Sequence, residues 1–132
     1  VFDHTAPGYA EAITAFTDGR GVDVVVEMLA NVNLERSLGL LAPYGRLVVV
    51  GNRGSLQFNP RAIMAKDAMV FGLMLFNMTA ADYAAVHAGV VAGLEARTLR
   101  PVVGREFPLE DAPKAHEAVL AAGSHGKIVL LP

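Results

Sequence analysis

The sequence predicts an α/β fold in which short parallel strands alternate with helices. Two apolar, β-branched runs, residues 22–29 and 46–51, are each bounded by turn residues, which is typical of parallel strands covered on both faces. Between them, residues 33–41 show the apolar spacing of a helix. Hydrophobic residues make up 53% of the chain and charged residues 18%, which agrees with buried strands and excludes a disordered chain.

The other elements continue this alternation, with bounds set by breaking and capping residues. Pro60 favours the first turn of a helix, and Thr79 is a helix-capping residue. We therefore expect strand-like backbone at residues 1–4, helices at 9–16, 61–66, 80–97 and 110–122, and strands at 69–76, 105–109 and 127–131. In the first helix, Ile13 and Phe16 are expected to face inward, and Asn33 is expected to cap the helix that follows it.

Composition narrows the classes of function. The net charge is −2 and no block of like charge is present, so we predict neither a nucleic-acid partner nor attachment to a membrane. Cysteine is absent, which excludes disulfides, thiol catalysis and cysteine-based metal sites. The uncharged run 68–81 is too short to cross a bilayer as a helix, and Asn77 interrupts it. We expect a buried strand there.

Candidate ligand residues lie where the two central strands end, because ligands of an open parallel sheet bind at the carboxyl ends of its strands. Gly51 and Gly54 would let the backbone approach a ligand, and Arg53 could meet a phosphate or a ribose. The same residue types are common in turns, so spacing alone leaves both readings open. His4 is expected at the same edge, at the end of its strand-like run.

No residue pattern indicates a catalytic or metal site. The four histidines lack metal-binding spacing, and Ser37, Ser55 and Ser124 lack the context of a catalytic nucleophile. The Gly-Arg-Gly string at residues 19–21 precedes its strand and lacks a third glycine, so it is interpreted as a turn. Glu27 lies inside an apolar strand and either reaches the open strand end or is paired; pairing is the favoured interpretation.

Several strings carry a resemblance to a known family. They are the runs 21–34, containing Glu-Met-Leu-Ala-Asn-Val-Asn, and 45–54, containing Val-Gly-Asn-Arg-Gly, with shorter matches at 59–61, 64–66, 108–110, 115–117 and 126–127. Together they strongly resemble the quinone oxidoreductases of the zeta-crystallin type, in the medium-chain dehydrogenase/reductase superfamily. The resemblance runs along the whole chain, and its two longest strings are more specific than a general nucleotide-binding pattern.

The resemblance implies a fold, a reaction and a cofactor site. Residues 1–100 would form the second half of a Rossmann-type doubly wound parallel sheet, and residues 101–132 a strand–helix–strand segment that belongs with a missing GroES-like domain. The reaction would be hydride transfer from NADPH to a quinone or another conjugated carbonyl, without catalytic zinc. By the same resemblance, the cofactor-contact positions are His4, Asn33, Val50, Gly51, Asn52, Arg53, Leu73, Met74 and Leu75.

Further expectations concern the whole protein. The phosphate-binding glycine loop and the substrate-proximal domain lie outside these residues, so we expect the chain alone to be inactive. Family members commonly dimerise by joining sheet edges, and we expect a cytoplasmic homodimer formed through residues 68–76, the run that begins at Ala68 and ends at Phe76. The alternatives are an enoyl reductase or a zinc alcohol dehydrogenase of the same superfamily, or a non-catalytic nucleotide-binding or structural module.

Overall fold

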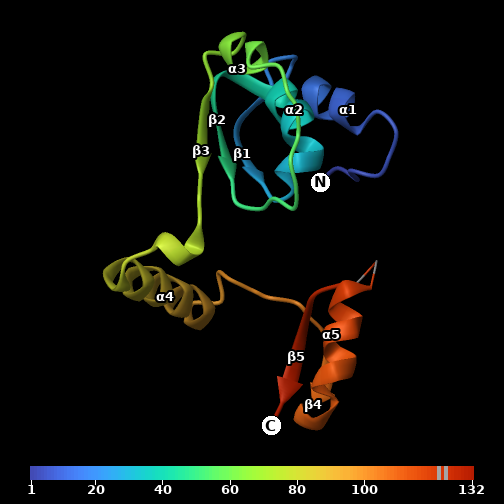
Figure 1. Cartoon of the computed structure of the whole chain (residues 1–132), viewed down its shortest axis with the longest axis vertical. Coiled ribbons are helices and arrows are strands. Elements are labelled where there is room, and N and C mark those ends of the chain that lie inside the picture. The colour runs from blue at the N-terminus through green and yellow to red at the C-terminus, as the bar shows by residue number, and fades with distance from the viewer. Residues whose placement is uncertain (122, 124) are drawn as a thin grey trace. The chain divides into compact units, whose positions relative to one another are not determined.

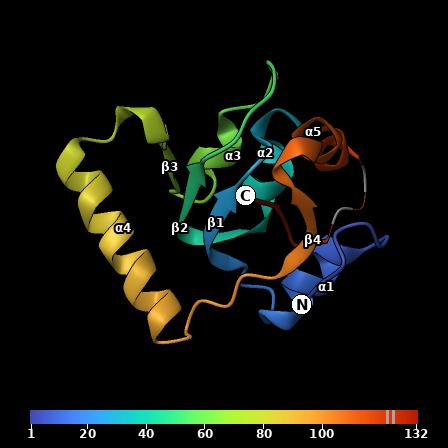
Figure 2. The same ribbon diagram turned by 90° about the horizontal axis from the view of Figure 1, so that it is seen from below.

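The computed structural model describes residues 1–121, 123 and 125–132. The chain forms two compact units, Val1–Asn77 and Met78–Pro132. Their ribbons are drawn in Figure 1 and, turned by 90°, in Figure 2. Two positions that the sequence analysis names, Ala122 as the end of a helix and Ser124, lie outside the described residues.

A three-stranded parallel sheet in the order β1-β2-β3 forms the centre of the first unit. The elements of this unit are α1 (Tyr9–Phe16), β1 (Val22–Glu27), α2 (Ala30–Leu40), β2 (Leu41–Val49), α3 (Arg61–Met64), β3 (Met69–Gly72) and the 3-10 turn η1 (Leu75–Asn77). The parallel α/β arrangement predicted from the alternation of strands and helices is confirmed. The Gly-Arg-Gly string is the expected turn before β1, where Arg20 pairs with Asp23 at 2.6 Å.

The core of this unit lies between α2 and the sheet. Leu38, Leu41 and Leu47 are each 1% exposed or less, and Leu34 and Ala30 join them in one cluster. The apolar spacing read from the sequence therefore identifies the buried side of α2 correctly. This packing fixes α2 against β1 and β2, and so fixes the two turns that leave the carboxyl ends of these strands.

Within the first unit, helices cover one face of the sheet. α2 and α3 lie on the same side of it (Figure 1), and Ile63 of α3 packs against the core cluster. The opposite face carries Val24, Val26 and Phe71, which are 50%, 62% and 49% exposed. The expected cover on both faces is therefore not provided by the helices of this unit. The reason is topological: right-handed crossovers between strands taken in sequential order place their helices on one side.

Two expected side-chain roles at the helices are also wrong. Asn33 lies inside α2, which begins at Ala30, so it does not cap the helix. Phe16 is 78% exposed and packs edge-to-face on Phe2, with ring centroids 5.7 Å apart. Ile13 is half-buried as expected, but Thr17, one turn further along, takes the inward position that was expected for Phe16.

Two expected strands differ as well. Residues 1–4 form no strand: no ladder hydrogen bonds hold them in the described part of the chain, and the Thr5 N–H donates instead to Asp3 Oδ1 at 2.8 Å. β3 ends at Gly72 rather than at residue 76. The Leu73 N–H still donates to Val49 O at 2.9 Å, but β2 ends there, and the chain turns into η1 because no partner strand remains.

The second unit contains one long helix and a strand–helix–strand segment. Its elements are α4 (Ala80–Glu95), β4 (Val103–Pro108), the 3-10 turn η2 (Leu109–Asp111), α5 (Ala112–Leu120) and β5 (Lys127–Leu131). The strand–helix–strand order is as predicted: α5 connects β4 and β5, and the structure shows that these two strands pair in parallel. Thr79 caps α4 through a capping box with Asp82, also as predicted for Thr79. In the part of the chain that the structure describes, no helix is long and apolar enough to cross a membrane.

Candidate functional site at the carboxyl ends of the strands

Backbone hydrogen bonds join the carboxyl ends of the three parallel strands. The N–H groups of Val50 and Gly51 both donate to Glu27 O, at 2.9 and 3.2 Å, and tie the end of β2 to the end of β1. The bond from the Leu73 N–H to Val49 O does the same for β3. The segments that leave the strands therefore start from one rigid edge, which is where a parallel sheet binds ligands.

The loop after β2 also supplies the missing cap of α2. The Ala30 N–H donates to Gly51 O at 2.9 Å, and the Asn31 N–H donates to Asn52 Oδ1 at 3.0 Å. In return the Arg53 N–H donates to Asn31 Oδ1 at 2.9 Å. The first N–H groups of α2 are thereby satisfied by the loop, so this helix start has no free donors there for a phosphate.

A cavity of about 620 Å³ opens at the ends of β2 and β3. The residues that line it are Val49, Val50, Gly51, Asn52, Gly72, Leu73, Met74 and Asn77. Five of the nine predicted cofactor-contact residues are among them, although they come from two separate stretches of sequence. The other four, His4, Asn33, Arg53 and Leu75, do not line this cavity.

Three lining residues were missed by the sequence analysis: Val49, Gly72 and Asn77. A usable signal existed for Gly72, because a glycine inside an apolar strand marks a bulge or a place where another group approaches closely. A Cβ atom placed on Gly72 would meet no heavy atom within 4 Å. Space in front of Gly72 is therefore open for another molecule.

Glycine is required at residue 51 by a contact within the chain, apart from any approach of a ligand. A Cβ atom on Gly51 would overlap the carbonyl oxygen of Met28 and would stand 2.8 Å from the carbonyl carbon of that residue. Gly51 is thus needed so that the ends of β1 and β2 can approach each other. At Gly54 a Cβ would make only an ordinary contact, 3.7 Å from Asn31 Nδ2.

Glu27 is the one buried charged residue in the described part of the chain, and it is 4% exposed. Its Oε2 accepts a hydrogen bond from Ser37 Oγ at 2.5 Å, and its Oε1 accepts from the Leu29 N–H at 2.7 Å and from Asn33 Nδ2 at 3.5 Å. Burial by itself raises the pKa of the Glu27 carboxyl, but these hydrogen bonds outweigh burial and leave the pKa below its ordinary value. The favoured interpretation of Glu27 as paired is confirmed, and its partners are neutral donors.

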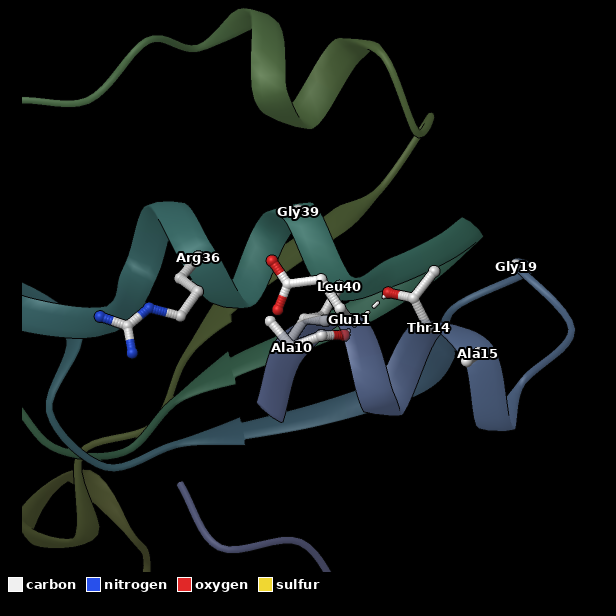
Figure 3. Close-up of a pocket in the computed structure, with 8 residues that line it drawn as sticks. All are labelled: Ala10, Glu11, Thr14, Ala15, Gly19, Arg36, Gly39 and Leu40. Atoms are coloured by element: carbon white, nitrogen blue, oxygen red, sulfur yellow. Dashed lines mark hydrogen bonds between the residues drawn. The ribbon is translucent and has the colours of Figure 1, made fainter. Parts of the chain in front are cut away.

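A second groove, of about 540 Å³, lies between α1 and α2. Figure 3 shows its lining: Ala10, Glu11, Thr14, Ala15, Gly19, Arg36, Gly39 and Leu40. Two polar side chains of this groove already have partners, since Thr14 Oγ1 donates to Ala10 O and Arg36 Nη1 donates to Tyr9 Oη at 2.8 Å. The strand-end cavity, by contrast, combines two asparagines with apolar walls, as ligand sites usually do.

Neither cavity is a metal centre by its residues. Across residues 1–121, 123 and 125–132, no group of three or more histidine, cysteine, aspartate or glutamate residues could hold a metal ion. The side chains around the strand-end cavity can therefore bind and orient a ligand, but they include no carboxylate, histidine or lysine to move a proton.

Comparison with known proteins gives consistent matches over the whole chain. A family model described as zinc-binding dehydrogenase matches residues 1–130. A quinone oxidoreductase of Homo sapiens is 41% identical in an alignment of 132 positions that covers 99% of this chain and 40% of that protein. A quinone oxidoreductase of Rattus norvegicus is 42% identical over the same shares of the two chains. The chain thus spans about two fifths of the length of these curated relatives.

A solved structure is also similar. A mycobacterial protein complexed with NADPH superposes with a TM-score of 0.80 and 26% identity, over 99% of this chain and 42% of that one. This likeness agrees with the predicted fold class, an α/β fold of the Rossmann type with parallel strands.

Proposed function

Because the chain belongs to the zinc-binding dehydrogenase family, we propose that it forms part of the cofactor site of an NADPH-dependent quinone reductase that works without catalytic zinc. The relatives named quinone oxidoreductase, at 41–42% identity, support this choice within the family. The structural observation that carries the proposal is the strand-end cavity, where Val50, Gly51, Asn52, Leu73 and Met74 come together. The substrate would be a quinone or another conjugated carbonyl.

The cavity suits the nicotinamide end of such a cofactor. Its walls are apolar at Val50, Leu73 and Met74, and the side chains of Asn52 and Asn77 supply polar groups. Asn52 is held in place, since its Oδ1 accepts from the Asn31 N–H and its Nδ2 donates to Gly54 O at 2.7 Å. When bound, NADPH would supply the hydride; the residues of this chain would orient the ring and exclude water from it.

The phosphates of the cofactor need other donors. The start of α2 is already capped by the loop after β2, so it offers no free N–H groups to an anion. We therefore propose that residues 1–100 are only part of the Rossmann cofactor domain, and that residues 101–132 return to a separate catalytic domain. On this proposal the chain alone binds NADPH weakly and does not reduce quinones.

A binding titration with paired variants tests the site. NADPH added to the isotope-labelled chain should shift the NMR signals of Gly72, Leu73 and Met74 at millimolar concentrations. Gly72→Val should weaken this binding, because its side chain enters the open space of the cavity. Gly39→Val is the matched control: it adds the same side chain to the groove between α1 and α2, where a Cβ also meets no atom within 4 Å. Equal effects of the two variants, or shifts confined to the α1–α2 groove, would contradict the proposed site.

The zinc-free reaction needs its own test, since the matching family model is described as zinc-binding. Metal analysis of the protein joined to its substrate-proximal domain should find no stoichiometric zinc, and NADPH oxidation should respond to quinones. Stoichiometric zinc together with oxidation of alcohols would favour the zinc alcohol dehydrogenase alternative. A cytoplasmic location is part of the same proposal and rests on the resemblance alone.

We also propose that the protein forms a homodimer through β3. This strand lies at the edge of its sheet and exposes apolar side chains, among them Met69 and Phe71. Because the Leu73 N–H bonds to β2, strand alternation directs the N–H of Val70 away from β2, toward a partner. Val70→Pro should therefore shift the sedimentation coefficient from dimer to monomer. A wild-type monomer, or a folded proline variant that remains a dimer, would refute edge pairing.

A further inference from the structure

Glu27 is a buried carboxylate whose partners in the described residues are all uncharged donors. A buried charge without a cation is costly unless hydrogen bonds satisfy it. Neutral donors do so here, and two of them, Asn33 and Ser37, come from the same helix, α2. Another is the N–H of Leu29, at the turn between β1 and α2.

A carboxylate suits this position because it only accepts hydrogen bonds. Oε1 receives two donors and Oε2 receives one, so both oxygens are used. A glutamine would place its NH₂ group against the Leu29 N–H and Asn33 Nδ2, or would force the Ser37 hydroxyl to accept instead of donate. The acceptor-only character of Glu27 therefore decides which way its partners turn.

Because the Glu27 carboxylate only accepts hydrogen bonds, the NH₂ end of the Asn33 amide must face it. Nδ2 points to the Glu27 carboxylate, and Oδ1 has no hydrogen-bond donor assigned to it among the described residues. Asn33 is half-buried in the first turn of α2, after the carboxyl end of β1, so part of its side chain is open to solvent there. An oxygen held in this way accepts hydrogen bonds from hydroxyl or amine donors and does not bind phosphate oxygens.

We propose that Glu27 is a positioning residue for the nucleotide: through Asn33 Nδ2 it holds Asn33 Oδ1 ready to accept a hydrogen bond from a ligand hydroxyl, as a ribose provides. This inference rests on the proposed cofactor site and adds to it the chemistry of one contact. Asn33 does not line the cavity between β2 and β3. A ligand that uses both must extend along the strand ends from the cavity to the turn after β1, as a nucleotide does.

A double-mutant cycle tests whether Glu27 acts through Asn33. The NADPH dissociation constant is measured by NMR titration for the wild-type chain, Glu27→Gln, Asn33→Ala and the double variant. Glu35→Gln on the exposed side of α2 serves as the control for loss of one negative charge. Each of the first two single variants should weaken binding roughly five- to tenfold, which is the effect of one hydrogen bond. The double variant should bind no more weakly than Asn33→Ala.

The outcomes separate this inference from the proposed function. If Glu27→Gln folds and binds NADPH as the wild type does, or weakens binding by the same factor in the Asn33→Ala background, Glu27 has a purely structural role and the inference is overturned. If the wild-type chain does not bind NADPH at all, the proposed function fails and the inference fails with it. A loss of binding that Glu35→Gln reproduces would be a general charge effect and would also overturn the inference.

A measurement on the wild-type chain covers the case in which Glu27→Gln does not fold. One Nδ2 proton of Asn33 should exchange with water more slowly than those of the exposed Asn59, because it is bonded to the buried carboxylate. Addition of NADPH should shift this signal. Fast exchange at both Nδ2 protons, or no shift on saturation with NADPH, would refute the arrangement without any variant.

Discussion

Gly51 offers the sharpest test of how the strand ends are built. In Gly51→Ala, the new Cβ would overlap Met28 O and lie 2.8 Å from the Met28 carbonyl carbon. Both atoms belong to the backbone, so no side-chain rotation can relieve the contact, and the ends of β1 and β2 must separate. The hydrogen bonds from the Gly51 N–H to Glu27 O and from the Ala30 N–H to Gly51 O lie at the same point.

The expected loss of stability follows from these contacts. Overpacking in a well-packed region costs about 1–3 kcal/mol, and each of the two backbone hydrogen bonds contributes about 1 kcal/mol net. We therefore expect Gly51→Ala to lower the free energy of unfolding by about 3 kcal/mol, measured by urea denaturation with NMR signals of the first unit as the probe.

Gly72→Ala is the matched control for Gly51→Ala. It makes the same chemical change at the same edge of the sheet, but its Cβ meets no atom within 4 Å, so stability should change by less than about 0.5 kcal/mol. Equal stability of the two variants would refute the conclusion that the backbone of β1 requires glycine at residue 51. In that case, a loss of NADPH binding by Gly51→Ala would come from contact between the new Cβ and the ligand. That is the reason for glycine that the sequence suggested.

Three further predictions concern the core, one helix cap and the buried carboxylate. Leu47→Ala should cost about 2–5 kcal/mol in urea denaturation, because Leu47 is 0% exposed, whereas Val26→Ala on the bare face should cost less than about 1 kcal/mol. Thr79→Ala should destabilise α4 by about 1 kcal/mol, seen as faster amide exchange in its first turn; unchanged exchange would mean that the capping box is not formed in solution. Since the pKa of Glu27 is lowered by folding, its ionised form adds stability above the ordinary carboxyl pKa, and that stability should be lost as the pH falls from about 5 through the lowered value. Glu27→Gln should be less sensitive to pH over this range, and an identical pH profile would contradict the assignment.

The sequence predicts the elements of this chain well because the signals for them are local. The β-branched runs give β1 and β2, Thr79 gives the start of α4, and the leucine spacing gives the buried side of α2. The start of α2 could not be predicted in the same way. Its cap is the side chain of Asn52, whose Oδ1 accepts a hydrogen bond from the Asn31 N–H. Asn52 lies 21 residues further along the chain than Asn31. No pattern within the helix itself reveals a partner so distant.

The candidate site was partly predictable for a related reason. The rule that ligands bind at the carboxyl ends of parallel strands, together with the resemblance, selects the segments after β2 and β3, and the structure brings these together around one cavity. His4 was expected at this edge because residues 1–4 were expected to form a strand. That strand does not form, because these residues find no partner strand in the described part of the chain. The contact with Met28 that requires glycine at residue 51 could not be predicted, because only the pairing of β1 with β2 brings these residues together.

The cap that the loop after β2 provides for α2 has a consequence for the way this region opens. Asn52 Oδ1 and Gly51 O accept hydrogen bonds from the N–H groups of Asn31 and Ala30. The loop therefore cannot leave its place without breaking these bonds to the first turn of the helix. Loop and helix start should therefore open to solvent as one cooperative unit, with a shared free energy of amide exchange. A ligand that orders the loop would then protect amides of α2 that it never touches, and a substitution at Asn52 would loosen the helix from outside it.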